Sequence, residues 1–243
     1  ALALADRLDT LVGIFGIGQA PTGSRYPFAL RRASLAVLRI MVEEQLDLDL
    51  RDCLALAAAQ YPDGVISAGS TEQVFDYMVE RFRAWYEEES IPAEVFKAVS
   101  ARNLSRPLDI QRRVHAVNTF TALPEAAALA AANKRVANIL GKLDSDHQFG
   151  EVSADLLVEP QEIDLASRLE SLAAVSQGHL EQGEYTDALA CLADLKVPVD
   201  AFFDGVMVNA DDAALRNNRL NLLKALRELF LQVADISQLV VGK

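Results

Sequence analysis

Four consecutive side chains, Arg216, Asn217, Asn218 and Arg219, have the chemistry of a nucleic-acid contact. Arginine and asparagine donate hydrogen bonds to phosphate oxygens and to base edges. The four stand in the stretch FFDGVMVNADDAALRNNRLNLL (202–223), whose apolar spacing predicts a helix from about 211 to 239 with Asn209 as its N-cap. A polar helix face that meets only water is the competing interpretation.

The helical period separates these side chains into two groups. Arg219 lies four residues after Leu215 and three before Leu222, so we expect it to point toward the core. Its expected partners are a carboxylate or helix-end carbonyl groups. The possible nucleic-acid contacts are the outward stripe and the residue beside it: Asn217, Asn221, Lys224 and Arg216.

A second set of donors lies on the helix predicted to begin at Pro124 and to end at Gly141. On its outward face stand Lys134, Asn138 and Lys142 at intervals of four residues, with Arg135 beside them. The predicted buried stripe is Leu129, Val136, Ile139, Leu140 and Leu143. Four arginines come just before this helix: Arg102, Arg106, Arg112 and Arg113. A basic stripe is commonly only a solvated face, and both interpretations stay open.

The distribution of charge keeps nucleic acid possible, although the formal net charge is -12. Residues 102–143 carry seven Lys and Arg against two acids, whereas residues 144–212 carry two against sixteen. Nucleic acid responds to the potential within a Debye length of roughly 8–10 Å more than to the total charge. The acidic total therefore does not exclude an RNA-binding surface on the basic part.

Catalytic and metal-binding patterns are not visible in the sequence. The glycines of GIFGIGQAPTG do not have phosphate-loop spacing, and a loop between helices is the better interpretation. His115, His147 and His179 are far apart and have no cysteine partner, which disfavours a metal site. Cys53 and Cys191 fit apolar helical patterns in a reducing compartment, with a disulfide between them left open. We predict no catalytic residue, no metal ligand and no cofactor in this chain.

The elements that must position these residues are helices nearly throughout, and the predicted fold class is all-α, a helical bundle. The chain is rich in Ala and Leu and has only 12 Gly and 8 Pro. First-turn prolines are expected at Pro92, Pro107 and Pro160, and Asp47 or Asp49 as the cap of the third helix. Residues 63–70 are the best candidate boundary. No apolar run is long enough to span a bilayer, and the first residues have the pattern of mid-helix, as in the C-terminal piece of a longer chain.

Four sequence blocks resemble a known family: ALADRLDTLVGIF, PTGSRYPFALRR, ANKRVANIL and FFDGVMVNADDAALRNNRLNLL. They are similar to the β subunits of bacterial tetrameric glycyl-tRNA synthetases. The resemblance covers essentially the whole chain. Residues 131–243 also resemble the anticodon-binding domain of arginyl-tRNA synthetases.

The resemblance implies a division of the chain and a set of partners. Residues 1–65 would be the tail of an HD-like helical domain with connecting helices, and residues 66–243 a helical anticodon-binding region with its core at about 131–243. The expected partners are glycine tRNA and the synthetase α subunit, in an α2β2 assembly in the cytoplasm and not at a membrane. Glycine activation with ATP would belong to the α subunit, so this segment is expected to be non-catalytic. Asp6 receives no metal role.

The resemblance also suggests what the basic helix and the loop after it would read. Glycine anticodons present two adjacent cytosines, and cytosine needs an acceptor for its N4 amino group and donors for O2 and N3. The loop KLDSDHQFG offers Asp144 or Asp146 as acceptor, Lys142 as donor, and His147 or Phe149 as a stacking face. The alternative is a helical scaffold that docks a basic protein partner through its acidic face.

Overall fold

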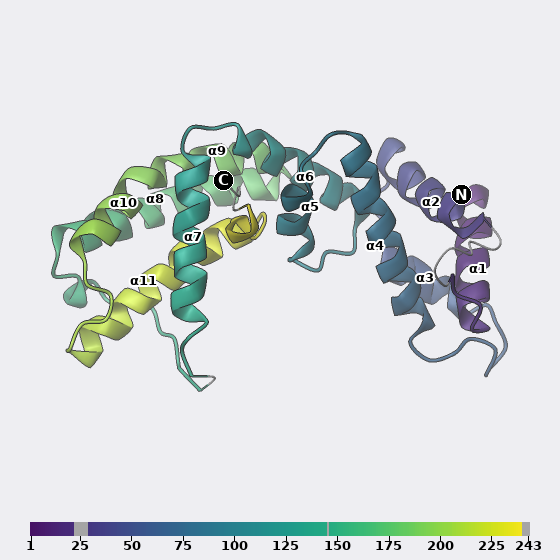
Figure 1. Ribbon diagram of the computed structural model, residues 1–243, viewed down its shortest axis with the longest axis horizontal. Coiled ribbons are helices and arrows are strands. Elements are labelled where there is room, and N and C mark those ends of the chain that lie inside the picture. Colours follow the sequence, from purple (N-terminus) through teal and green to yellow (C-terminus); the bar gives the residue numbers. More distant parts are fainter. Residues whose placement is uncertain (22–28, 145, 240–243) are drawn as a thin grey trace. The chain divides into compact units, whose positions relative to one another are not determined.

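The computed structural model describes residues 1–21, 29–144 and 146–239, so most of the block PTGSRYPFALRR lies outside the described residues. Helices make up the regular structure of these ranges, and the all-α prediction is confirmed (Figure 1). The chain divides into two compact units, residues 1–96 with 103–111 and residues 97–102 with 112–243. None of the described helices combines the length and the apolar character that crossing a bilayer requires.

The first unit is built around α1 (Leu2–Gly16), which packs against three other helices. These are α2 (Leu30–Glu43), α3 (Leu50–Ala58) and α4 (Ser70–Glu88). Two glycines of the GIFGIG stretch belong to α1 and provide close approach. A Cβ on Gly13 would lie 2.4 Å from the Tyr61 hydroxyl, which donates a hydrogen bond of 3.0 Å to the Asp9 carbonyl. Gly13 and Gly16 therefore serve packing inside α1, and the predicted loop begins only after them, with Gly18 at a φ of 75° in the turn that follows the helix.

The unit boundary falls well after residues 63–70, because α4 packs on α1, α2 and α3. Residues 103–111 also return to the first unit. There the Asp49 side chain accepts from the Arg51 amide at 2.9 Å and caps α3, and it also accepts from the Ser105 hydroxyl at 2.5 Å. Of the two caps considered, Asp49 is confirmed. The connection between the units runs through α5 (Ala93–Ser100) and α6 (Pro107–Thr121).

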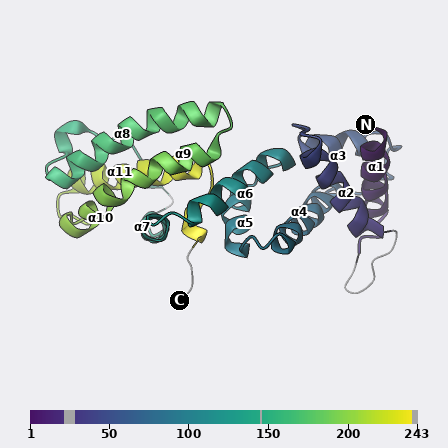
Figure 2. The same ribbon diagram turned by 90° about the horizontal axis from the view of Figure 1, so that it is seen from above.

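The second unit holds the remaining helices. In Figure 2, α8 (Pro160–Glu181) and α9 (Tyr185–Leu192) run side by side, and α10 (Lys196–Gly205) also packs on α8. Helix α7 (Ala126–Leu140) packs against α11 (Ala213–Leu231) and against the short helix η4 (Ile236–Gln238). Two further single turns are η2 (Ala154–Leu156) and η3 (Ala193–Leu195).

The helix ends follow the predicted prolines only in part. Pro107 and Pro160 are first-turn prolines, as expected, since a missing N–H costs nothing there. Helix α7 begins two residues after Pro124 and ends at Gly141, its C-cap. The Asn209 cap is wrong: Asp212 accepts from the Ala214 and Leu215 amides and begins α11. The predicted long last helix is also wrong, because α11 stops at Leu231 before η4.

A buried ion pair joins α8 to α11. Glu162 is 0% exposed, and one of its oxygens accepts from the Arg219 Nε, whose residue is 6% exposed. Arg219 Nη1 donates to the Met207 carbonyl at 2.8 Å, and the second Glu162 oxygen accepts from the Val158 and Glu159 amides at 2.9 and 2.8 Å. The prediction that Arg219 turns inward to a carboxylate and a carbonyl is confirmed.

Removing the cation of this pair should be costly, because it leaves a buried carboxylate unpaired. We expect Arg219→Met to lower the free energy of unfolding by about 3–5 kcal/mol, measured by urea denaturation. Arg219→Met combined with Glu162→Gln should lose less, since the Gln oxygen still accepts from the two amides and carries no charge. Equal losses in the single and the double variant would contradict a role for the unpaired charge.

The same pair should make stability depend on pH. Burial alone would raise the pKa of Glu162, but the hydrogen bonds from Arg219 and from the Glu159 and Val158 amides lower it below 4.5. A lowered folded-state pKa contributes stability that is complete above the unfolded pKa and is lost as pH falls through the folded pKa. We expect the free energy of unfolding to decrease from pH 4.5 downward, and less steeply in Glu162→Gln. Identical pH profiles of both proteins would exclude this contribution.

Candidate RNA-binding surface

Helix α7 turns its basic residues to solvent. Lys134, Arg135 and Asn138 are exposed, and Lys142 is exposed in the turn that follows. The opposite face is buried through Leu129, Ala132, Asn133 and Val136, and the Asn133 amide is satisfied by the Leu129 carbonyl at 3.1 Å. The predicted stripe is confirmed for Leu129 and Val136, while Ile139, Leu140 and Leu143 are only half-buried.

Among the residues that the structure describes, no carboxylate neutralises the cations of this face. Within the residues that the structure describes, Lys134, Arg135 and Lys142 have no ion-pair partner. Arg135 instead lies over the ring of Phe203 on α10, with its guanidinium carbon 4.1 Å from the ring centroid. A cation–π contact leaves the charge in place and holds its orientation, so the face keeps its positive potential.

The segment after α7, residues 146–153, lies along α11. Asn218 accepts from the Ser153 amide at 2.8 Å and donates to the Ser153 carbonyl at 3.0 Å. Asn221 accepts from the Gly150 amide at 3.1 Å and donates to the Glu151 carbonyl at 3.2 Å. The interpretation of Asn221 as an outward contact is therefore wrong, because its amide is engaged with this segment.

Aromatic residues of the segment continue the contact with α11. The Lys224 ammonium lies 5.0 Å from the centroid of the Phe149 ring, and the His147 and Phe149 rings meet edge to face at 4.7 Å. Lys224 also lies 3.4 Å from the Glu228 carboxylate. Asp144 and Asp146 are exposed at the start of the segment, close along the chain to Lys142. The structure thus joins α7, the segment and Lys224 in one part of the second unit.

The arginines predicted upstream of α7 have other surroundings. Arg106 belongs to the first unit, where it pairs with the Asp47 carboxylate at 2.9 Å. Arg113 donates to the Gln232 and Val233 carbonyls at the end of α11, at 2.5 and 2.9 Å, and to the Tyr185 hydroxyl at 3.2 Å. Arg112 is exposed and lies beside Gly183. Sequence patterns gave no sign that Arg113 would cap a helix 119 residues away.

At the start of α11 the helical period correctly predicted that Arg219 is buried and Asn217 is exposed. Arg216 is half-buried and donates to the Ala210 carbonyl at 2.8 Å, so part of its donor capacity is used within the chain. Asn217 is exposed. Asn218 is only 2% exposed, which the sequence did not indicate.

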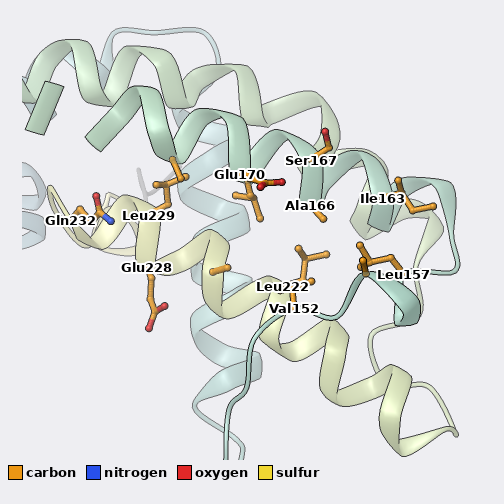
Figure 3. A pocket seen from close by; sticks show the side chains of 14 residues that line it. Val152, Leu157, Ile163, Ala166, Ser167, Glu170, Leu222, Glu228, Leu229 and Gln232 are labelled. Atoms are coloured by element: carbon orange, nitrogen blue, oxygen red, sulfur yellow. The ribbon is translucent and has the colours of Figure 1, made fainter. Parts of the chain in front are cut away.

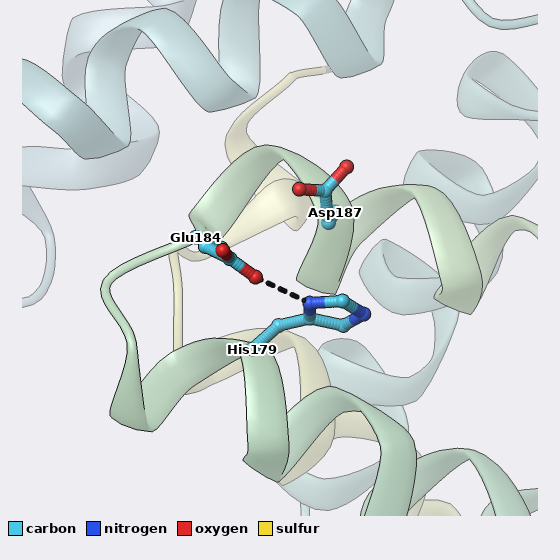
Figure 4. Close-up of side chains that lie close together, drawn as sticks. All are labelled: His179, Glu184 and Asp187. Atoms are coloured by element: carbon cyan, nitrogen blue, oxygen red, sulfur yellow. Dashed lines mark hydrogen bonds and ion pairs between the residues drawn. The ribbon is translucent and has the colours of Figure 1, made fainter.

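Two other features of the second unit have a different character. His179 Nδ1 lies 2.8 Å from the Glu184 carboxylate, with Asp187 nearby (Figure 4). Ligand atoms of these three residues lie within 4.8 Å of one another, but the two acids are exposed and the contact that is present is a hydrogen bond between the end of α8 and the turn before α9. This cluster joins α8 to α9 and includes no residue of α7.

An apolar groove lies between α8, α11 and residues 152–157 (Figure 3). Val152, Leu157, Ile163 and Leu222 line it, and Glu170 stands among the lining residues of α8. Apolar walls and a carboxylate do not attract phosphate. The groove fits the scaffold alternative better than RNA.

The family comparisons divide the chain at nearly the same places as the geometry. A family model described as glycyl-tRNA synthetase beta subunit matches residues 1–101, and one described as DALR anticodon binding domain matches residues 129–236. Two relatives, the glycine–tRNA ligase β subunits of Chromohalobacter salexigens and Marinobacter nauticus, are 54% and 55% identical to this chain. The alignments extend over 241 and 240 residues, 98% of this chain in each case. The chain belongs to the glycyl-tRNA synthetase β subunit family. It spans about a third of these relatives, 35% and 34% of their lengths.

The matched ranges include some of the predicted RNA-binding residues and leave out others. Helix α7 from Leu129 on, the segment after it and α11 all fall inside the range of the anticodon-binding model. Arg106, Arg112 and Arg113 fall between the two matched ranges. The range of the β-subunit model extends past residue 65, where the first domain was expected to end.

The contacts of Arg113 predict a loss of stability when its fork geometry is removed. Lysine keeps the charge but cannot reach two carbonyls and a hydroxyl together. We expect Arg113→Lys to lower the free energy of unfolding by about 1–2 kcal/mol in urea denaturation, while Arg102→Lys at an exposed position changes it little. If Arg113→Lys weakened RNA binding and left stability intact, the RNA-contact prediction for Arg113 would be favoured over the cap.

Proposed function

We propose that this chain is the tRNA-binding, anticodon-recognising part of a glycine–tRNA ligase β subunit. The observation that carries the proposal is the exposed face of α7, whose cations are not neutralised within the described chain and which lies within the match to the anticodon-binding model. Phosphate binding needs such unpaired cations, since each contact releases counterions from the RNA. Lys134, Arg135, Asn138 and Lys142 are proposed to position the RNA backbone.

The segment after α7 is proposed to read the bases. Asp144 and Asp146 are exposed acceptors suited to the N4 amino group of cytosine, and Lys142 is a donor suited to O2 or N3. His147 and Phe149 supply aromatic surface on which an unstacked base can lie. Asn217 and Arg216 are proposed as further contacts at the start of α11. Arg106 and Arg112 are also proposed to contact tRNA, but no contact in the structure connects them to this surface.

The activity of the whole enzyme is a wider proposal. In it, the β subunit delivers glycine tRNA to an α subunit that attaches glycine with ATP, in an α2β2 complex in the cytoplasm. The names of the relatives support the ligase, and the family resemblance implies that glycine activation belongs to a separate α subunit. A second candidate function is the docking of a basic amphipathic protein segment in the apolar groove of α8 and α11, which Figure 3 shows.

Salt dependence tests the proposed role of α7. Replacing Lys134 or Lys142 with Ala should weaken binding of glycine tRNA and make the slope of log affinity against log salt less negative by about 0.7 for each lost phosphate contact. Binding can be measured by fluorescence anisotropy between roughly 50 and 200 mM salt. Arg168→Ala on α8 removes the same charge from the acidic part and should leave the slope unchanged. Equal effects of all three variants would mean that only net charge matters and would contradict the proposed phosphate contacts of α7.

A further inference from the structure

Helix α11 holds the segment after α7 by side chains at a regular interval. Asn218 binds Ser153, Asn221 binds Gly150 and Glu151, and Lys224 lies over Phe149. From Asn218 to Asn221 to Lys224 the residue numbers on α11 rise by three at each step, whereas the residue numbers of their partners in the segment fall from 153 to 149. The segment therefore runs antiparallel to α11 in a fixed register.

Carboxamides suit this contact because they carry the same donor and acceptor as a peptide group. Both Asn218 and Asn221 use their oxygen for a backbone N–H and their nitrogen for a backbone carbonyl. Residues 148–153 form no helix or strand, so their backbone groups need partners from elsewhere. The two asparagines supply those partners as a neighbouring strand would.

The anchored segment is the one that carries the exposed acceptors. Asp146 lies four residues before Gly150, and His147 and Phe149 lie between them. A segment of this length without regular structure would otherwise sample many conformations, and binding would have to select one. Fixing the residues at 149–153 limits the positions that Asp146 and the rings can take.

We propose that Asn218 and Asn221 are positioning residues for RNA recognition, which hold residues 146–153 in their base-reading conformation without contacting RNA. The inference rests on the proposed function. It assigns Lys224 the same role through Phe149, in place of a phosphate contact. It also separates two properties of the surface: α7 gives affinity, and the anchored segment gives discrimination between bases.

Asn221 is the better position for the test, because it is only half-buried whereas Asn218 is 2% exposed. In the full chain, Asn221→Ala should accelerate hydrogen exchange of the Gly150 amide while leaving the urea midpoint close to the original. Asn221→Leu keeps the branched shape of the side chain, removes both hydrogen bonds and should accelerate the same exchange. Asn209→Ala is the matched control, since Asn209 is exposed before α11 and has no hydrogen bond within the described residues.

The deciding readout is discrimination between two RNA probes. These are a glycine tRNA transcript and the same transcript with one anticodon cytosine replaced. We expect Asn221→Ala to lower affinity for the first by about tenfold, to change affinity for the second less, and to leave both salt slopes unchanged, because no phosphate contact is lost. Asn209→Ala should alter none of these values.

The outcomes separate this inference from the function on which it rests. If the unaltered chain bound neither transcript, the proposed function would fail, and the inference with it. If it bound both and Asn221→Ala freed the Gly150 amide without changing the ratio of affinities, the positioning role would be wrong and tRNA binding would stand. A less negative salt slope in Asn221→Ala would likewise overturn it, by showing that Asn221 contacts the backbone.

Discussion

The buried pair of Glu162 and Arg219 is the constraint on which the geometry of the second unit depends. Arg219 bonds Glu162 at the start of α8 and the Met207 carbonyl before α11, so it fixes the rotation of α11 about its own axis. Asn218 precedes it and Asn221 follows two residues later, and their directions follow from that rotation. A charge that costs energy to bury thus sets which face of α11 meets the segment after α7. The cost of removing both charges from water offsets much of their attraction, so the pair adds less stability than its contacts suggest.

Charge is distributed unevenly along the chain. Acids outnumber bases by 35 to 23, yet only two of them fall in residues 102–143, where the cations of α7 stand, whereas sixteen fall in residues 144–212. A concentrated basic face keeps its potential within a Debye length, and acidic surroundings disfavour RNA elsewhere on the unit. Arg135 over Phe203 belongs to this pattern, because an aromatic ring orients a cation without cancelling it. The local cations therefore matter more than the net charge.

The sequence predicted those features that a helical period carries. The all-α class, the inward Arg219 and the exposed Lys134 and Asn138 all follow from spacing on a single helix. The period says nothing about partners distant in the chain, which is why the burial of Asn218 by Ser153, 65 residues away, and the cap formed by Arg113 were missed. Asn221 was placed outward because nothing local indicates that a loop covers it. The loop itself was located, but not its register.

The choice of asparagine at positions 218 and 221 fits the proposed RNA-binding surface. An aspartate could accept from the Gly150 or Ser153 amide, but it could not donate to the Glu151 or Ser153 carbonyl. It would leave that carbonyl without its partner and would also bring negative charge next to the proposed phosphate path. The carboxamide satisfies both backbone groups and adds no charge. In a chain this acidic, neutral anchors add no carboxylate to those already present at Asp144, Asp146 and Glu151. The first two are the acceptors proposed for the amino group of cytosine.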